Sequence, residues 1–266
     1  MVARTTSWPI AWLGLEVNLM CFIQTVMSKP GIGRYGIVYF LCQRWGSLRA
    51  LGGALGNSPW FITIGLVLKI GVIPCHFWGP LVIKNLEPLV IFTFLTWQKV
   101  GPLLLLSISM QTQQRKVLII LNAIGGRVFI LFATDVPLIM LFSRLTQRAW
   151  LISLIPHPHI IWTYFLIYVL ILSSVLPSLQ KREKKWDLTI GLLNLGGLPP
   201  FSGFGAKVEA LMSLGIMSHI VPLLIRRVIS LYAYLRLAIT YTPTIRVGTP
   251  MILALTGGWV LIYPTS

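Results

Sequence analysis

The sequence alternates long apolar stretches with short polar ones, and the apolar stretches are long enough to cross a lipid bilayer. Four stretches contain no Asp, Glu, Lys or Arg at all: residues 50–68, 149–180, 188–206 and 247–266. Each is close to or longer than the roughly 18–20 residues that a transmembrane helix needs. This pattern predicts an integral membrane protein built from helices.

The apolar pattern predicts about ten helices joined by short turns. Arg44 and Arg49 lie inside the second of them, which is unusual for a helix in lipid. We expect an all-α bundle that forms one membrane domain over residues 1–266, with no soluble domain. The expected helices cover residues 8–27, 35–56, 59–79, 87–108, 115–133, 136–155, 158–180, 187–217 (broken near 199–203), 219–242 and 247–264.

Composition and charge agree with a membrane protein. The chain has 266 residues, of which 56% are hydrophobic and 11% are charged, whereas a soluble domain carries about 25% charged residues. It contains 22 Lys and Arg against 6 Asp and Glu. Such an excess would suggest nucleic acid binding in a soluble protein, but here the basic residues are spread among apolar runs, and we expect no nucleic acid partner.

The basic residues also predict an orientation. Ten helices place both termini on one side of the membrane, and most basic loop residues then fall on the opposite side. Cytoplasmic or matrix loops carry the excess of Lys and Arg, so we expect loop 180–187 on that side. Its basic residues could attract anionic lipid headgroups such as cardiolipin; they are Lys181, Arg182, Lys184 and Lys185.

Three features that could suggest other chemistry are better explained as structure. Gly31–Gly36 has the spacing GxGxxG, but it follows a membrane helix rather than a strand, so a turn is expected and not a dinucleotide site. Pro156–His159 holds two histidines without carboxylate or thiol partners. Cys21, Cys42 and Cys75 are isolated, without haem or iron–sulfur spacing. We expect no metal, cofactor or redox centre on this chain.

The charged residues inside the predicted helices are the candidates for chemistry. Glu16, Lys69 and Lys99 lie within apolar runs, and Lys207 follows a run broken by Pro199 and Pro200. A lysine at mid-membrane costs about 3 kcal/mol on insertion scales, so such residues usually face the protein interior. The structural alternatives are a simple buried ion pair for Glu16 and, for Lys69, a side chain that reaches out to the membrane surface.

Two of these lysines lie beside predicted helix breaks. Lys69 precedes Pro74, and the segment Gly196–Phe204 holds two prolines and three glycines, so neither helix can be continuous. Broken helices that end at a polar centre are typical of transporters. Burial disfavours a charged amine and a nearby carboxylate favours it, so movement of Glu16 relative to Lys69 could control whether the lysine holds its proton.

Five segments, spread over most of the chain, match one known family in the order in which the family has them. They are Trp12–Asn18, Leu68–Trp78, Leu95–Pro102, Gly196–Lys207 and Tyr234–Arg236. Together these segments resemble chain 2 of the proton-pumping NADH:ubiquinone oxidoreductase, respiratory complex I, in its mitochondrially encoded form.

The resemblance implies a fold and a set of roles. The family is antiporter-like, with two inverted five-helix repeats that each contain a discontinuous helix. Glu16 matches the glutamate at the subunit junction, Lys69 its partner on the first broken helix, Lys99 the central relay lysine and Lys207 the lysine of the second broken helix. His76 matches a histidine near the proton path. The family moves protons while other subunits oxidise NADH and reduce quinone.

The resemblance also implies surroundings for the chain. We expect a multi-pass protein of the mitochondrial inner membrane, with both termini on the intermembrane-space side and loop 180–187 on the matrix side. Expected partners are other membrane-arm subunits, including the neighbouring antiporter-like subunit and the small subunit 4L. FMN, iron–sulfur clusters and ubiquinone are expected in the complex as a whole.

The chain also departs from the family pattern. It starts just before the glutamate helix, so we expect the first repeat to be truncated, and Gln147 stands where the family usually has a histidine. Two alternatives therefore stay open: a non-pumping bridge within the membrane arm, and a stand-alone cation/proton antiporter. The extra positive charges within expected helices are Arg44, Arg49, Arg127, Arg144 and Arg148.

Overall fold

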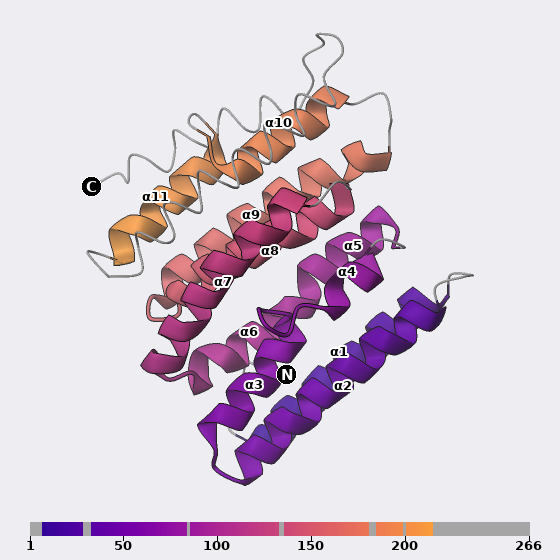
Figure 1. Ribbon diagram of the computed structural model, residues 1–266, viewed down its shortest axis with the longest axis vertical. Coiled ribbons are helices and arrows are strands. Elements are labelled where there is room, and N and C mark those ends of the chain that lie inside the picture. Colours follow the sequence, from indigo (N-terminus) through magenta and orange to yellow (C-terminus); the bar gives the residue numbers. More distant parts are fainter. Residues whose placement is uncertain are drawn as a thin grey trace. The chain divides into compact units, whose positions relative to one another are not determined.

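All secondary structure in the described part of the chain is α-helical, as expected (Figure 1). The computed structural model describes residues 7–28, 33–83, 86–132, 136–180, 185–198 and 201–214. The expected helices at 219–242 and 247–264 lie outside these residues. The helices are α1 (Trp8–Met27), α2 (Gly33–Leu55), α3 (Pro59–Ile70), α4 (Trp78–Ile83), α5 (Pro88–Leu95), α6 (Trp97–Ser109), α7 (Thr112–Phe132), α8 (Val136–Ser153), α9 (Pro158–Gln180), α10 (Lys185–Gly196) and α11 (Ser202–Leu214).

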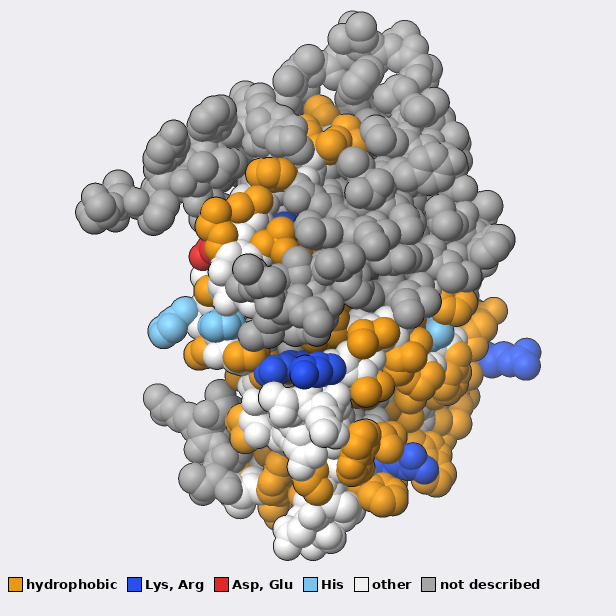
Figure 2. Space-filling view, turned by 60° about the vertical axis from the view of Figure 1, so that its left-hand side comes forward, with side chains coloured by type: hydrophobic (Ala, Val, Ile, Leu, Met, Phe, Trp, Pro, Cys, Tyr) orange, Lys and Arg blue, Asp and Glu red, His pale blue; other side chains and the backbone are white. Residues whose placement is uncertain are grey.

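Three segments of the described chain are long and apolar enough to cross a membrane. They are Trp8–Met27, Pro88–Ser109 and Pro158–Leu176; the shorter Pro59–Ile70 is also apolar. On the face shown in Figure 2, hydrophobic side chains cover much of the described surface, with a few patches of Lys and Arg. The count of ten membrane helices stays a prediction.

Proline marks where several of these helices begin. Proline occupies one of the first two positions of α1, α3 and α5, where its missing N–H would have no intrahelical partner anyway. α9 also begins at a proline, Pro158.

The two expected helix breaks are confirmed. α3 ends at Ile70, Gly71 adopts a left-handed conformation with φ of 75°, and the next helix begins at Trp78. α10 ends at Gly196, and Gly197 has φ of 77° before α11 begins. Glycine enters this region of backbone space without strain, so each break starts at a residue suited to it.

A third break corrects the sequence prediction. The helix expected over residues 87–108 is divided at Thr96 into α5 and α6. Pro102, the only proline between Lys99 and the end of this segment, lies inside α6 instead of ending it. The break leaves the carbonyl of Leu95 available to a side chain, and Arg144 donates to it.

The chain forms two compact units, each described here by itself. The first comprises Met1–Gly126 and Ala133–Arg148, and the second Arg127–Phe132 and Ala149–Ser266. In the first unit, α2 contacts α1, α3 and α4, while α6 contacts α1, α3 and α5. In the second, α9 contacts α10 and α11, which also contact each other. The single membrane domain over 1–266 stays a prediction.

An aromatic cluster and a close helix contact hold the first unit together. The ring centroids of Tyr39 lie 5.3 Å from Phe22, 5.5 Å from Trp78 and 5.8 Å from Phe94, distances at which aromatic rings attract one another. α2 and α3 approach so closely that a Cβ atom on Gly65 would lie 2.6 Å from backbone atoms of α2. Small residues permit this approach between membrane helices.

Candidate functional site

Side chains from other helices donate to the last carbonyl groups of α3, of which that of Leu68 also accepts the backbone N–H of Gly71 at 3.2 Å. The carbonyl of Lys69 accepts hydrogen bonds from Gln43 Nε2 and Lys99 Nζ, both at 3.1 Å. The carbonyl of Leu68 accepts one from Trp78 Nε1 at 3.2 Å. A cation at this position also complements the negative end of the helix dipole.

The turn between α3 and α4 is held in a similar way. Arg148 on α8 donates from Nη1 to the carbonyl of Gly71. On the other side of the turn, the backbone N–H of Ile73 donates to Asn122 Oδ1 at 3.2 Å. The break between α3 and α4 is therefore specifically stabilised, because its backbone groups are hydrogen-bonded to side chains of α2, α6, α7 and α8.

Lys99 lies at the centre of this arrangement and is 6% exposed. Besides its bond to the Lys69 carbonyl, its ammonium lies 4.8 Å from the ring centroid of Trp78 and 5.1 Å from that of Phe94. Both distances permit cation–π attraction. Lys99 therefore faces the interior of the first unit, as expected.

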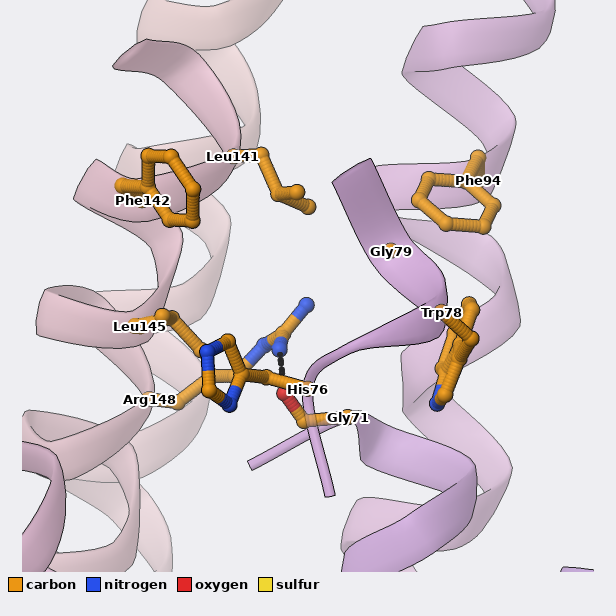
Figure 3. Close-up of a pocket in the computed structure, with 9 residues that line it drawn as sticks. All are labelled: Gly71, His76, Trp78, Gly79, Phe94, Leu141, Phe142, Leu145 and Arg148. Carbon is orange, nitrogen blue, oxygen red and sulfur yellow. Dashed lines mark hydrogen bonds between the residues drawn. The ribbon is translucent and has the colours of Figure 1, made fainter. Parts of the chain in front are cut away.

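A small cavity lies next to these aromatic rings (Figure 3). Its volume of about 10 Å³ admits about one water molecule. His76 and Arg148 border it on one side, and the His76 Nδ1 atom lies 3.3 Å from the carbonyl of Pro74. The complete lining is Gly71, His76, Trp78, Gly79, Phe94, Leu141, Phe142, Leu145 and Arg148.

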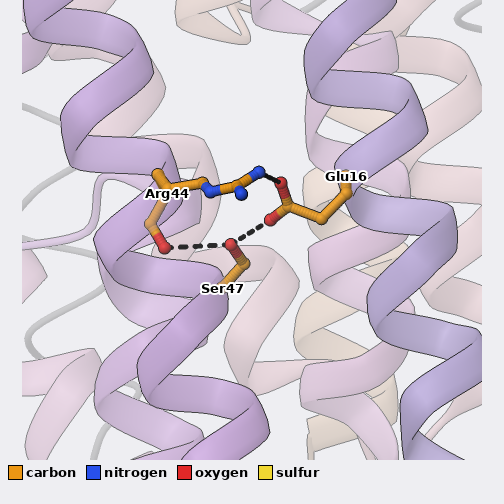
Figure 4. A network of polar contacts seen from close by, with 3 residues as sticks. All are labelled: Glu16, Arg44 and Ser47. Carbon is orange, nitrogen blue, oxygen red and sulfur yellow. Dashed lines mark hydrogen bonds and ion pairs between the residues drawn. The ribbon is translucent and has the colours of Figure 1, made fainter.

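Glu16 binds residues of α2 (Figure 4). Arg44 Nη1 lies 2.6 Å from Glu16 Oε2, and the Ser47 hydroxyl donates to Glu16 Oε1. The same hydroxyl lies 3.0 Å from the main-chain carbonyl of Arg44, so its single proton serves one acceptor at a time. The Glu16 side chain is 8% exposed, and both of its oxygens are bonded.

Lys69 lies in the last turn of α3 and is 2% exposed. In the described chain its amine has no hydrogen bond or ion pair, but it is electrostatically attracted by Glu16 and repelled by Arg44. Glu16 therefore pairs with Arg44, and its expected role as the partner that controls the proton on Lys69 stays a prediction. Gly46 packs on Lys69, because a Cβ atom there would lie 2.8 Å from Lys69 Cγ.

Lys207 has the same kind of contact in the second unit. It is 5% exposed, and its amine donates to the carbonyls of Leu195 and Gly196 at 2.9 and 2.8 Å. These carbonyls end α10, so Lys207 binds the end of a broken helix as Lys99 does. Each unit is described by itself, and a link between Lys99 and Lys207 stays a prediction.

Asn194 completes a reciprocal contact between α10 and α11. Its Oδ1 atom accepts from the backbone N–H of Gly203 at 2.9 Å and lies 3.3 Å from the Ser202 hydroxyl. A residue of α10 therefore caps the start of α11, while Lys207 of α11 caps the end of α10. Gly203 permits this, because a Cβ atom there would lie 2.1 Å from the Asn194 carbonyl.

Sequence reasoning missed several of these contacts. Arg44 was noted only as an extra positive charge, although Glu16 is the sole acidic residue before Glu87 and a charge inside a membrane helix needs a partner. That argument could have found the pair. Arg148, beside the unexpected Gln147, gave no comparable signal. The described residues contain no group of three or more His, Cys, Asp or Glu placed to hold a metal ion.

Comparisons with known proteins agree on one family. The chain is 31% identical over 271 residues to NADH-ubiquinone oxidoreductase chain 2 of Anopheles gambiae, covering 88% of this chain and 80% of that protein. It is 27% identical over 278 residues to the protein of the same name in Lumbricus terrestris, covering 91% and 83%. No protein-family profile matches.

The fold agrees with a solved structure as well. A chain in the structure of respiratory complex I from Thermus thermophilus with bound aureothin superposes with a TM-score of 0.84. The match covers 98% of this chain and 73% of that one at 18% sequence identity, so it speaks for the fold alone.

Proposed function

Because the chain belongs to the NADH-ubiquinone oxidoreductase chain 2 family, we propose that it moves protons across the membrane while other subunits of complex I carry the electrons. Family membership makes it a subunit of NADH-ubiquinone oxidoreductase in the respiratory chain. The observation that carries the proposal is the burial of Lys69, Lys99 and Lys207, each beside a helix break. Buried ionisable residues within membrane segments commonly mark ion pathways.

The contacts of Lys99 are compatible with gain and loss of a proton. A neutral amine keeps two N–H groups, so the bond to the Lys69 carbonyl can persist after a proton leaves. Its lone pair can then accept the next proton. The rings of Trp78 and Phe94 favour the ammonium form and burial favours the neutral form, so opposing influences act on the same amine.

Glu16, His76 and the cavity supply the remaining parts of the proposed path in the first unit. Glu16 acts electrostatically on Lys69, which is the coupling that a proton switch requires. His76 can carry a proton on either ring nitrogen, and one water in the cavity beside it would extend the path toward the Trp78 and Phe94 rings. Lys207 is proposed as the relay residue of the second unit.

The finer arrangement belongs to the proposal. We expect about ten membrane helices in two inverted repeats, multi-pass insertion in the mitochondrial inner membrane, termini on the intermembrane-space side and loop 180–187 on the matrix side. The partners would be the neighbouring antiporter-like subunit and the small subunit 4L, with cardiolipin near the basic loop. FMN, the iron–sulfur clusters and ubiquinone would be bound by other subunits.

The substitution Lys99→Met in the intact complex tests the proposal. Methionine keeps a similar volume and cannot hold a proton, so the ratio of protons pumped to electrons transferred should fall. NADH oxidation by an artificial acceptor that bypasses the membrane arm should be unchanged. Lys116→Met is the matched control, because Lys116 is exposed at the start of α7. Normal assembly of Lys99→Met with a full pumping ratio would exclude the relay role.

A non-pumping bridge is the second candidate, and one observation favours it. Lys99 and Lys207 both donate to carbonyls at the ends of broken helices, a purely structural role in which they would stabilise the breaks. This candidate predicts that Lys99→Met lowers the amount of assembled complex while the assembled fraction pumps at the normal ratio. Membership in the complex I family sets aside the stand-alone antiporter.

A further inference from the structure

Two buried arginines on one face of α8 bind two different helix breaks. Arg144 donates from Nη1 to the carbonyl of Leu95, the last residue of α5. Arg148 donates from Nη1 to the carbonyl of Gly71, which follows α3 (Figure 3). The two arginines are four residues apart in α8, so they lie on the same face of the helix. Their exposed fractions are 4% and 7%.

Glycines allow α8 to approach the first of these breaks closely. A Cβ atom on Gly71 would lie 3.4 Å from Arg148 Nη1, and one on Gly79 would lie 3.2 Å from Leu141 Cδ2. Leu141 precedes Arg144 by three residues, so it shares the face of the two arginines. This face of α8 is therefore packed against the turn between α3 and α4 as well as bonded to it.

The two arginine contacts lie at the two ends of the Lys99 contact. Lys99 extends from the first turn of α6, directly after the break that Arg144 binds. Its amine donates to the carbonyl of Lys69, two residues before the carbonyl that Arg148 binds. The backbone that carries the lysine and the backbone that accepts its hydrogen bond are therefore both tied to α8.

The charges of the two arginines act on the same amine. An arginine stays protonated at any ordinary pH, and both arginines repel a protonated Lys99. The Lys69 carbonyl and the rings of Trp78 and Phe94 attract it. The place of the Lys99 amine therefore depends on α8 twice, through the backbone that the arginines hold and through their charge.

We propose that Arg144 and Arg148 are positioning residues for Lys99: they hold α8 across both breaks and so set the separation between the Lys99 amine and the end of α3. The inference rests on the proposed function, because it takes Lys99 as a relay residue. Neither arginine needs to exchange a proton in this role. A shift of α8 would move both breaks together, and the amine would leave or regain the Lys69 carbonyl.

A structure of the intact complex that carries Arg148→Met tests the positioning. Methionine has no donor for the Gly71 carbonyl, so the Lys99 amine should move beyond about 3.5 Å from the Lys69 carbonyl, out of hydrogen-bond range. Arg49→Met is the matched control, because Arg49 is an exposed arginine of the same unit, and it should keep the distance of 3.1 Å. An unchanged distance in Arg148→Met would overturn the proposal.

Arg144→Met applies the same measurement to the other break. It leaves the Gly71 contact in place and removes the donor to the Leu95 carbonyl, so the same separation of the Lys99 amine is expected. This variant decides the question if Arg148→Met does not assemble. A retained bond between Lys99 and the Lys69 carbonyl would show that the arginines only cap the breaks, and the proposal would fail.

The ratio of protons pumped to electrons transferred gives a second test. Arg148→Met should lower this ratio in the assembled complex, and it should cause no further loss when Lys99→Met is already present, because the arginine acts through the lysine. A further loss of equal size in both backgrounds, or a normal ratio in Arg148→Met alone, would contradict the proposal. If Lys99→Met itself pumps at the full ratio, the relay is wrong, and the measured distance still decides whether the arginines position Lys99.

Discussion

Lysines at the helix breaks bind carbonyls that a continuous helix would have satisfied itself. The last carbonyls of any helix lack intrahelical partners, and here the amines of Lys99 and Lys207 supply them. Arg148 and Asn194 act on the same breaks from other positions. The proposed proton relay and the observed backbone capping therefore involve the same side chains, and variants must separate them.

Asn194 offers a residue whose capping role can be tested without changing a charge. Asn194→Ala removes the acceptor for the Gly203 N–H, and loss of such a cap costs about 1 kcal/mol. We expect a lower melting temperature for the assembled complex, measured by loss of quinone reductase activity on heating. Asn194→Ser keeps a neutral side-chain oxygen that can accept a hydrogen bond, so it should melt higher than Asn194→Ala. Equal melting of the wild type and Asn194→Ala would show that the cap contributes nothing.

The burial of the lysines was predictable, whereas their partners were not. Lys69, Lys99 and Lys207 stand out in the sequence because a charge inside an apolar run is expensive in lipid. Such contacts can join positions far apart in the sequence, since Lys99 binds a carbonyl 30 positions earlier. Helical periodicity predicts which face of its helix a residue lies on, but it does not predict which other helix packs against that face.

At the level of helices, breaks and close contacts depend on glycine. Gly71 and Gly197 begin the two breaks with positive φ, and both breaks could be predicted because proline and glycine gather there. The break at Thr96 between α5 and α6 could not be predicted, because no proline or glycine lies at that position. The close approach of α2 and α3 at Gly46 and Gly65 was also missed, since a glycine within a helix does not reveal what packs against it.

Gly65 provides the test of that approach. A methyl group in Gly65→Ala would lie 2.6 Å from the backbone nitrogen of Ala50 and 2.6 Å from the carbonyl of Gly46, and neither can move without shifting α2. Overpacking of this kind costs about 1–3 kcal/mol of folding free energy. We therefore expect Gly65→Ala to give less assembled complex and to lower the temperature at which the complex dissociates. Native gels run after heating to a series of temperatures measure both.

Gly52→Ala is the matched control on α2. Nothing lies within 4 Å of the added methyl group, and alanine favours the helix by about 1 kcal/mol, so assembly should be unchanged or slightly better. If Gly52→Ala and Gly65→Ala behaved alike, the close approach of α2 and α3 would not matter to stability.

For the whole molecule, the sequence predicted the class of protein better than its arrangement. An all-helical fold is confirmed in the described residues, and the family rests on relatives about 30% identical over most of the chain. The expected inverted repeats stay a prediction, because they depend on how distant helices are placed, which apolar patterning does not encode. Both units present exposed apolar side chains, such as Leu13 and Trp45 in the first and Leu166 and Leu170 in the second.

These apolar surfaces predict how the protein behaves outside its complex. Exposed apolar area of this extent marks contacts with protein or lipid, so we expect the chain to be recovered in mild detergent only as part of a large assembly. Size-exclusion chromatography with light scattering checks this, with the intact complex in the same detergent as the control. Recovery of a folded, monodisperse single chain would contradict the expectation.

The reciprocal contact between α10 and α11 has a mechanical consequence. Lys207 joins the two half-helices by holding the carbonyls of Leu195 and Gly196, while Asn194 holds the start of α11. If Lys207 turned toward a proton acceptor, both carbonyls would lose this donor at once, while the Asn194 contact would remain. The angle between α10 and α11 would then be less constrained, so a single proton transfer would permit a hinge movement.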